Sequence, residues 1–296
     1  MKSLRTFLRD LIDYAGLFPP AALPMDEAVG NFAGYHGGEQ TWILARFVVP
    51  AARLRELEAA AEGLLPGPGE RPWQLSVLGG EDPRATAEAL EALERRHPEG
   101  ELVATAVEMK ASSTEAIRRG LETLPEGVEV FFEIPHDRDP APLLGSLTGT
   151  RGRGKIRSGG VTEDAFPSPE EMARFLRACR TAQVPFKATA GLHHPLRGRY
   201  PLTYEKGSPE GTMFGFLNVF AASAFLLHQD LSETELLGLL TETDPEALTF
   251  SPGGLRWRGR DLSLEELDRS RHGFALSYGS CSFVEPIEDL QAMDLL

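Results

Sequence analysis

The amino-acid sequence predicts an α/β fold, a (β/α)8 TIM-type barrel built from the whole chain. Eight strand-like apolar runs alternate with helical patterns along the 296 residues. The first seven runs begin at intervals of roughly 25 to 32 residues, the length of one strand–helix unit. Most runs are rich in Val, Ile, Phe and Thr without strict alternation, which is typical of parallel strands covered on both faces. An open, doubly wound parallel sheet is the alternative.

The predicted strands cover most of the chain at regular spacing. They are residues 42–50, 73–79, 102–110, 128–135, 155–158, 184–190, 213–219 and 274–283. The seventh run has two interpretations, because residues 213–227 form a continuous apolar stretch that also fits a buried helix. A chain of 296 residues suits one α/β barrel, so we predict a single domain over residues 1–296.

Helix start signals follow several of these runs. Asp82 precedes Pro83, which places a capping carboxylate before a proline at the first helical position. Three Ser/Glu pairs have the spacing of capping boxes: Ser112/Glu115, Ser168/Glu171 and Ser232/Glu235. These signals predict helices between the strands, as the barrel requires.

Two segments lie outside the predicted repeat. Residues 1–40 precede the first predicted strand and hold an apolar loop followed by a helix from about Met25. We predict that they form an N-terminal extension that plugs one end of the barrel. Residues 228–270 are predicted to add a helix over 232–240 and a small hairpin over 248–257.

Composition excludes several classes of partner. The net charge of −14 and pI near 5.0 disfavour nucleic acid and anionic membrane surfaces. Cys179 and Cys281 are the only cysteines, too few for a disulfide framework, which favours a reducing compartment such as the cytoplasm. The longest apolar run, residues 214–227, is too short to cross a bilayer. A homo-oligomer is compatible with the sequence.

Charged residues stand in or at the ends of several apolar runs, where catalytic groups lie in α/β barrels. They are Glu108, Lys110, Glu133, Lys155, Arg157 and Lys187. Buried charges are costly unless they are paired, hydrated or used. One interpretation is a non-catalytic barrel with a structural layer of interior salt bridges, and the other is a catalytic cluster.

Two lysines on consecutive predicted strands indicate amine chemistry. Burial and a second nearby cation lower the pKa of an amine, and a neutral amine can add to a carbonyl carbon. The resulting iminium accepts the electrons of an adjacent C–C bond. We therefore predict a Schiff-base lyase acting on a small anionic carbonyl compound. Lys155 is the predicted nucleophile, Lys187 lowers its pKa, and Glu133, Glu108 or His193 is the acid or base.

A family resemblance supports this chemistry. Residues 155–160 read Lys-Ile-Arg-Ser-Gly-Gly, and after a capped helix residues 184–191 read Val-Pro-Phe-Lys-Ala-Thr-Ala-Gly. The stretch from 155 to 191 resembles the deoxyribose-phosphate aldolase family of class I aldolase TIM barrels. The resemblance implies that Lys155 forms the Schiff base and that Lys187 perturbs it. Arg157 replaces a small hydroxyl residue of the family, which implies a different substrate.

The segment after Lys155 also predicts a binding site for the substrate's anionic group. Arg157 is followed by Ser158, Gly159 and Gly160, whose small side chains leave backbone N–H groups accessible to a carboxylate or phosphate. Further candidate substrate-binding residues are Thr189, His194, Asn218 and Ser280.

Two other chemistries are weighed against the lysine reaction. A metal-dependent lyase, isomerase or hydrolase would place a divalent ion on Glu108, Glu133 and a histidine. Our main prediction includes no metal and no cofactor. Cys281 lies in the hydroxyl-rich segment 277–286, and no oriented His–acid pair is evident beside it. We predict that this segment is a loop that either satisfies its own backbone hydrogen bonds or gives N–H donors to an anion.

Overall fold

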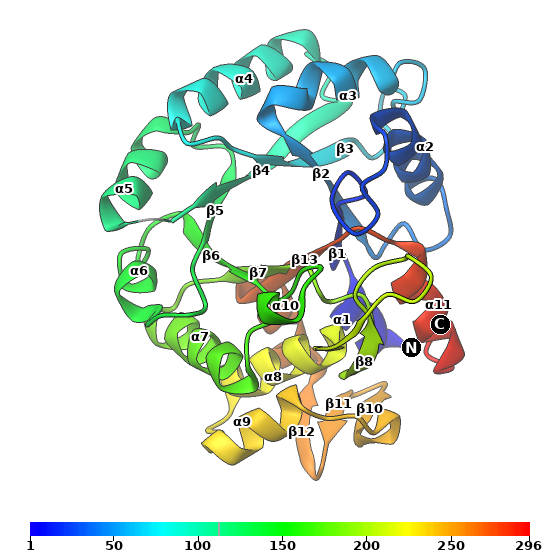
Figure 1. Ribbon diagram of the computed structural model, residues 1–296, viewed down its shortest axis with the longest axis vertical. Coiled ribbons are helices and arrows are strands. Elements are labelled where there is room, and N and C mark those ends of the chain that lie inside the picture. The colour runs from blue at the N-terminus through cyan, green and yellow to red at the C-terminus, as the bar shows by residue number, and fades with distance from the viewer. Residues whose placement is uncertain (112) are drawn as a thin grey trace.

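The chain folds into a closed barrel of eight parallel strands in a computed structural model that describes residues 1–111 and 113–296. Going round the barrel, the order is β1-β2-β3-β4-β5-β6-β7-β13, and every neighbouring pair is parallel. Figure 1 looks down the barrel, with the strands around the centre and helices outside them. The predicted (β/α)8 TIM-type barrel is confirmed.

Seven of the eight predicted runs contain barrel strands. The barrel strands are β1 (Ile12–Tyr14), β2 (Leu44–Pro50), β3 (Trp73–Leu78), β4 (Leu102–Lys110), β5 (Glu129–Glu133), β6 (Gly152–Arg157), β7 (Phe186–Thr189) and β13 (Ala275–Ser280).

The first barrel strand comes from the segment that the sequence predicts as an extension outside the barrel. β1 pairs with β2 on one side and with β13 on the other, where Asp13 is level with Gly279. Three residues are too few to show a strand pattern in the sequence, so the prediction is wrong here. The barrel is closed by strands from opposite ends of the described chain.

Of the two interpretations of the seventh run, the strand is wrong and the buried helix is confirmed. Glu210–Met213 form β9, which pairs antiparallel with β8 (Gly198–Pro201) in a hairpin, and Phe216–His228 form the helix α8. All residues from Phe216 to Leu226 are buried. Because this helix has no polar face, the sequence lacks the periodicity that separates a helix from a buried strand.

Helices cover the outside of the barrel between the strands. They are α1 (Lys2–Leu8), α2 (Met25–His36), α3 (Leu54–Ala60), α4 (Pro83–Arg96), α5 (Thr114–Thr123), α6 (Ala141–Gly145), α7 (Pro169–Ala182), α10 (Leu264–Gly273) and α11 (Val284–Ala292), besides α8. The capping boxes at Ser168 and Ser232 and the cap at Asp82 are confirmed. The cap predicted at Ser112 lies outside the described residues, and Ser113 caps α5.

The predicted decoration before the last strand is present with one addition. Helix α9 (Glu233–Leu240) is followed by the hairpin β10 (Leu248–Ser251) and β11 (Gly254–Trp257), as predicted. A third strand, β12 (Arg260–Ser263), pairs with β11. This sheet lies beside α1, where Phe7 and Phe250 meet edge to face with ring centroids 5.3 Å apart.

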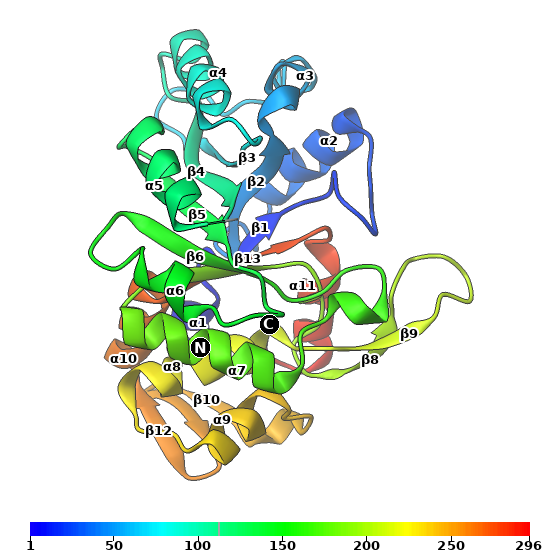
Figure 2. The ribbon, with the colours of Figure 1, turned by 60° about the vertical axis from the view of Figure 1, so that its left-hand side comes forward.

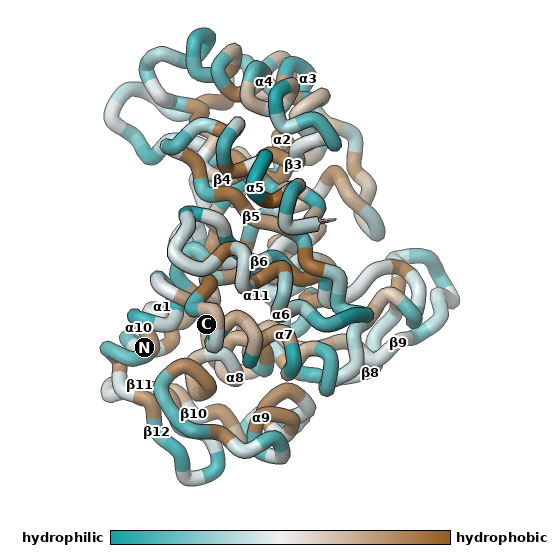
Figure 3. Tube along the Cα trace, turned by 90° about the vertical axis from the view of Figure 1, so that its left-hand side faces the viewer, coloured by the Kyte–Doolittle hydropathy of each residue, from teal (hydrophilic) through white to brown (hydrophobic). Residues whose placement is uncertain are grey.

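Hydrophobic segments concentrate in the barrel strands and on the inner sides of the helices, while the turns are hydrophilic (Figure 3). The β8–β9 hairpin projects from the barrel, as Figure 2 shows. The hairpin follows β7 in the sequence, so it lies at the carboxyl ends of the barrel strands. Among residues 1–111 and 113–296, no helix combines the length and apolar character needed to cross a membrane.

Candidate functional site

Five charged side chains inside the barrel form a continuous series of contacts, which we call the ion-pair chain: Asp13, Lys187, Glu108, Lys155 and Glu133. Lys187 Nζ lies 2.5 Å from Asp13 Oδ2 and 2.6 Å from Glu108 Oε1. Lys155 Nζ lies 2.7 Å from Glu108 Oε2 and 2.8 Å from Glu133 Oε2. The structure thus brings together four residues selected from the sequence and adds Asp13.

Strand register explains why these groups meet. Lys155 is level with Lys187 of β7 and with Glu133 of β5. Residues that are level on neighbouring parallel strands point to the same face, so all three side chains turn into the barrel. Lys110, at the end of β4, is exposed and makes no ion pair in the described part of the chain.

Glu108 lies between the two amines and reverses one expectation from the sequence. We expected Lys187 to lower the pKa of Lys155. Burial does favour the neutral amine, but the charges and hydrogen bonds of Glu108 and Glu133 outweigh it and raise the pKa of Lys155. Burial also opposes ionisation of Glu108, yet Lys155 and Lys187 hold the pKa of that carboxyl far below its usual range. Both groups are therefore charged in the resting protein.

Two hydroxyl groups and one guanidinium also contact the buried carboxylates. Ser76 Oγ donates to Glu108 Oε1 at 2.7 Å, and Ser277 Oγ donates to Asp13 Oδ2 at 2.8 Å. Arg46 Nη1 lies 3.7 Å from Asp13 Oδ1. Sequence reasoning missed these residues. The sequence does offer a signal for them, because Arg46, Ser76 and Ser277 are polar residues inside predicted apolar runs.

A cavity of about 300 Å³ opens at the carboxyl ends of the strands, above the ion-pair chain. Lys155, Arg157, Thr189, His193 and Cys281 line it together with Gly160 and Phe18. Its volume suits a small metabolite. Arg157 is half-exposed, and its Nε lies 3.7 Å from Glu133 Oε1. Six of the thirteen sequence-predicted site residues therefore line one cavity: Glu108, Lys155, Arg157, Gly160, Thr189 and His193.

Several predicted substrate-binding residues instead hold the structure together. Ser158 Oγ donates to a backbone carbonyl after β7 at 2.6 Å. Gly159 packs so closely against a facing glycine that an added Cβ would come within 2.7 Å of its Cα. Asn218 is fully buried in α8, and its amide donates to two carbonyls near the end of α9. It does not line the cavity.

His194 and Ser280 also have partners outside the cavity lining. His194 Nδ1 lies 2.6 Å from Asp289 Oδ2 of α11, and its ring stacks on Tyr200 with centroids 3.5 Å apart. Ser280 is buried, and its Oγ accepts a hydrogen bond from a nearby backbone N–H at 3.3 Å. Both residues stabilise the segments that border the cavity.

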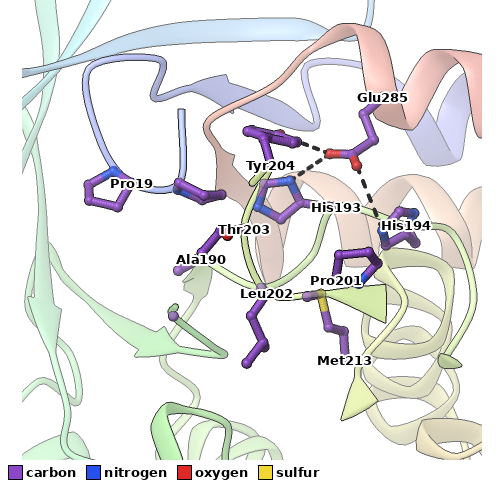
Figure 4. Close-up of a pocket in the computed structure, with 13 residues that line it drawn as sticks. Pro19, Ala190, His193, His194, Pro201, Leu202, Thr203, Tyr204, Met213 and Glu285 are labelled. Atoms are coloured by element: carbon purple, nitrogen blue, oxygen red, sulfur yellow. Dashed lines mark hydrogen bonds and ion pairs between the residues drawn. The ribbon is translucent and has the colours of Figure 1, made fainter. Parts of the chain in front are cut away.

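His193 has two partners that the sequence analysis missed. Its Nδ1 lies 2.8 Å from Glu285 Oε2, and its Nε2 lies 3.9 Å from Cys281 Sγ. Figure 4 shows His193 beside Glu285 and Tyr204 in the pocket that adjoins the main cavity. Because β7 and β13 are neighbours in the barrel, the residues that follow these strands meet. That adjacency was hidden by the strand wrongly predicted between them.

The carboxylates proposed for a metal site are engaged elsewhere. Within residues 1–111 and 113–296, no three His, Cys, Asp or Glu side chains are grouped so that they could hold a metal ion. Glu108 and Glu133 contact Lys155 instead, and His136 Nδ1 lies 3.5 Å from Glu171 Oε2.

Comparisons with protein-family models, curated proteins and solved structures give no match to this chain, so its function is argued from the site alone.

Proposed function

We propose that the protein is an enzyme, a lyase that acts on a small carbonyl compound bearing a carboxylate or phosphate. One observation carries the proposal. The Lys155 amine lies at the wall of the cavity, between two carboxylates that can exchange protons with it. The Lys155 side chain is 6% exposed and lines the cavity, and the Glu133 side chain is 20% exposed and lines a second pocket that shares Arg157 with it.

The reaction requires that Lys155 first lose a proton, because its ion pairs keep the resting amine charged. Glu133 is the nearest partly exposed acceptor. Burial opposes ionisation of Glu133, but Lys155 and then Arg157 lower its pKa. A substrate anion bound to Arg157 would cancel the latter contribution and make Glu133 a stronger base.

The neutral amine would then form a bond to the carbonyl carbon, and loss of water would leave an iminium at Lys155. A base then removes the proton of a hydroxyl on the carbon β to the iminium, the bond between the α and β carbons breaks, and a carbonyl fragment leaves while the electron pair forms an enamine. Return of that proton to the enamine carbon gives an iminium, and water hydrolyses it to release the second product and the Lys155 amine. Glu133 or Glu108 would carry the proton between these steps. The chain's own residues supply every group in this scheme.

Borohydride reduction tests this proposal directly. The protein is incubated with a panel of small aldehydes and 2-oxo acids, reduced, digested and analysed by peptide mass. We expect a reduced adduct on Lys155 that Lys155→Met abolishes and that Lys2→Met, a change at an exposed lysine of α1, leaves in place. The absence of an adduct on Lys155 across the panel excludes the Schiff-base reaction.

A non-catalytic role for the two lysines is the second candidate, and one observation favours it. Glu108 accepts hydrogen bonds from both amines, and Lys187 is fully buried. In that case the ion-pair chain only stabilises the barrel. Lys155→Met would then weaken folding without changing any activity per folded molecule, which activity assays normalised by circular dichroism would show.

A further inference from the structure

Cys281 lines the same cavity as Lys155 but comes from a different part of the barrel. It follows the last barrel strand β13, its residue is 5% exposed, and its side chain lines the cavity together with His193. His193 follows β7, the neighbouring strand. The thiol is therefore held by the barrel at the carboxyl ends of the strands, where a substrate in the cavity can reach it.

The imidazole of His193 is oriented by a carboxylate on its far side. Glu285 stands in the first turn of α11, and its Oε2 lies 2.8 Å from His193 Nδ1. A proton on Nδ1 satisfies that contact, so Nε2 is left to face Cys281 Sγ at 3.9 Å. Tyr204 Oη donates to the same carboxylate oxygen at 3.1 Å, which fixes Glu285 further (Figure 4).

We propose that Cys281 and His193 are catalytic residues of a second covalent centre, oriented by Glu285, that hydrolyses small esters or thioesters. The arrangement is that of a cysteine nucleophile, an imidazole acid–base and a positioning carboxylate, three groups contributed by three separate segments. It goes beyond the lyase proposal, because it assigns an acyl-transfer reaction to a residue that the lysine chemistry does not use.

The electrostatics of the site favour a thiolate beside an imidazolium. Burial opposes ionisation of Cys281, but the hydrogen bond and charge of His193, with smaller effects of Tyr204 and the Ala21 N–H, hold the pKa of the thiol below its ordinary value. Burial also disfavours the charged imidazole, yet Cys281 and Glu285 raise the pKa of His193 to about 9.

Other titratable groups also face the thiol. Tyr14 of β1 and Tyr204 of the β8–β9 hairpin interact with it electrostatically. Lys155 and Arg157 of β6 and Glu108 of β4 line the same cavity. Burial and the charges on Cys281 and Glu285 raise the pKa of Tyr204, so its hydroxyl stays neutral and can donate a hydrogen bond to a thiolate or carboxylate.

The chemistry balances without any group from outside the chain except water. The thiolate of Cys281 bonds to the acyl carbon, the carbonyl electron pair moves to oxygen, and its return expels the alcohol or thiol, which takes the proton from His193 Nε2. His193 then removes a proton from water as the oxygen adds to the acyl-enzyme. Expulsion of the Cys281 thiolate leaves a carboxylic acid, which releases its proton to solution, and the imidazolium–thiolate pair is restored.

Cys179, the other cysteine of the chain, lies in an environment that makes a thiol unreactive. It is fully buried in α7, and burial alone raises the pKa of its thiol well above the ordinary value. Cys281 differs because it lines a cavity and its thiol has three hydrogen-bonding partners, one of which is the His193 imidazole. Cys179 therefore serves as an internal reference in any labelling experiment.

The rate of alkylation by iodoacetamide against pH tests the ion pair in the wild-type protein. An ordinary thiol loses roughly 50-fold in rate between pH 8.5 and pH 6.5, because its thiolate fraction falls with a pKa near 8.5. We expect Cys281 to lose less than about fivefold, and Cys179 to remain unlabelled. A drop of roughly 50-fold at Cys281 overturns the proposal.

Variants identify the partner of the thiol. His193→Gln should restore the steep pH dependence of Cys281 alkylation, and Glu285→Gln should make it steeper than in the wild type by weakening the imidazolium. The matched control is His272→Gln, at an exposed histidine of α10, which should keep the flat profile. A flat profile in His193→Gln overturns the assignment. If that variant does not fold, Glu285→Gln and the wild-type profile still decide it.

An ester assay separates a catalytic thiol from one that is only reactive. With p-nitrophenyl acetate we expect a burst of nitrophenol equal to the enzyme concentration, an acetyl group on Cys281 in the quenched protein, and no burst in Cys281→Ser. The absence of an acetyl adduct on Cys281 overturns the acyl-transfer step. Borohydride adducts report on Lys155 and acetyl adducts on Cys281, so the two proposals fail separately.

Discussion

Glu108 is the single residue on which the barrel interior depends most. It accepts hydrogen bonds from Lys155, Lys187 and Ser76, and its side chain is 2% exposed. A carboxylate held in this way fixes the position of Lys155 at the cavity wall. It is also the counter-ion that the two neighbouring lysines share, and its charge helps to raise the pKa of Lys155.

Removing one charge from the ion-pair chain should lower the free energy of unfolding. Lys187→Met leaves the buried carboxylates of Asp13 and Glu108 without their shared amine, and we expect a loss of about 3–5 kcal/mol in the free energy of unfolding. Urea denaturation measures it. The exposed Lys206→Met is the control, with an expected change within about 0.5 kcal/mol. A loss below about 1 kcal/mol would mean that Asp13 and Glu108 are satisfied by other groups.

Residue-level reasoning from the sequence found one half of the site and missed the other. Lys155, Arg157, Thr189 and His193 stand out because polar residues that end apolar runs lie at the mouth of a barrel. The partners of His193 were missed because Cys281 and Glu285 lie 88 and 92 positions away in the chain. Their contact depends on which strands are neighbours, and local sequence does not carry that information.

Whether an element could be predicted from the sequence also depends on whether its interactions are local or distant in the chain. Capped helices were predicted correctly because a Ser followed three positions later by Glu makes its hydrogen bonds within one turn. The strand β1 was missed because its three residues become a strand only through β2 and β13. The run that contains helix α8 was left open between a strand and a buried helix, because burial on all sides removes the polar face of this helix.

The cap of α7 gives a test at the level of an element, because this helix follows β6, the strand of Lys155 and Arg157. Ser168 Oγ accepts a hydrogen bond from the Glu171 backbone N–H, and Glu171 Oε2 accepts one from the Ser168 backbone N–H. We expect Ser168→Ala to lower the free energy of unfolding by about 1 kcal/mol. Glu170→Ala, which removes an exposed first-turn charge without touching the cap, should cost less than about 0.5 kcal/mol by urea denaturation. Equal losses of free energy of unfolding in the two variants would show that the cap hydrogen bonds do not stabilise the protein.

The whole molecule should lose stability in acid through the same interior charges. The folded protein lowers the pKa of Glu108 and Glu133, so each contributes stability above an unfolded-state pKa of about 4.3 and loses it as the pH falls towards the folded value. Lys155 has a raised pKa, so its contribution is present below about pH 10.4 and is lost at higher pH. We therefore expect a fall in Tm below about pH 4.

The share of Glu108 in this acid loss can be measured. In Glu108→Gln the side chain no longer has to be protonated, so the difference in Tm between pH 7 and pH 3 should be smaller than in the wild type. Glu99→Gln, at an exposed carboxylate, should keep the wild-type difference. If Tm falls as much in Glu108→Gln as in the wild type between pH 7 and pH 3, other carboxylates govern acid unfolding. Glu133→Gln serves if Glu108→Gln does not fold.

The pairing of β1 with β13 has a consequence for how the protein can be made. Asp13 and Ser277, which hydrogen-bond inside the barrel, are 264 positions apart, and Cys281 and Glu285 lie just beyond the closing strand. A ribosome must therefore deliver almost all of the described chain before the barrel can close and before Cys281 can meet His193. Shortened translation products that end before β13 carry the lysines but neither the closed barrel nor the thiol.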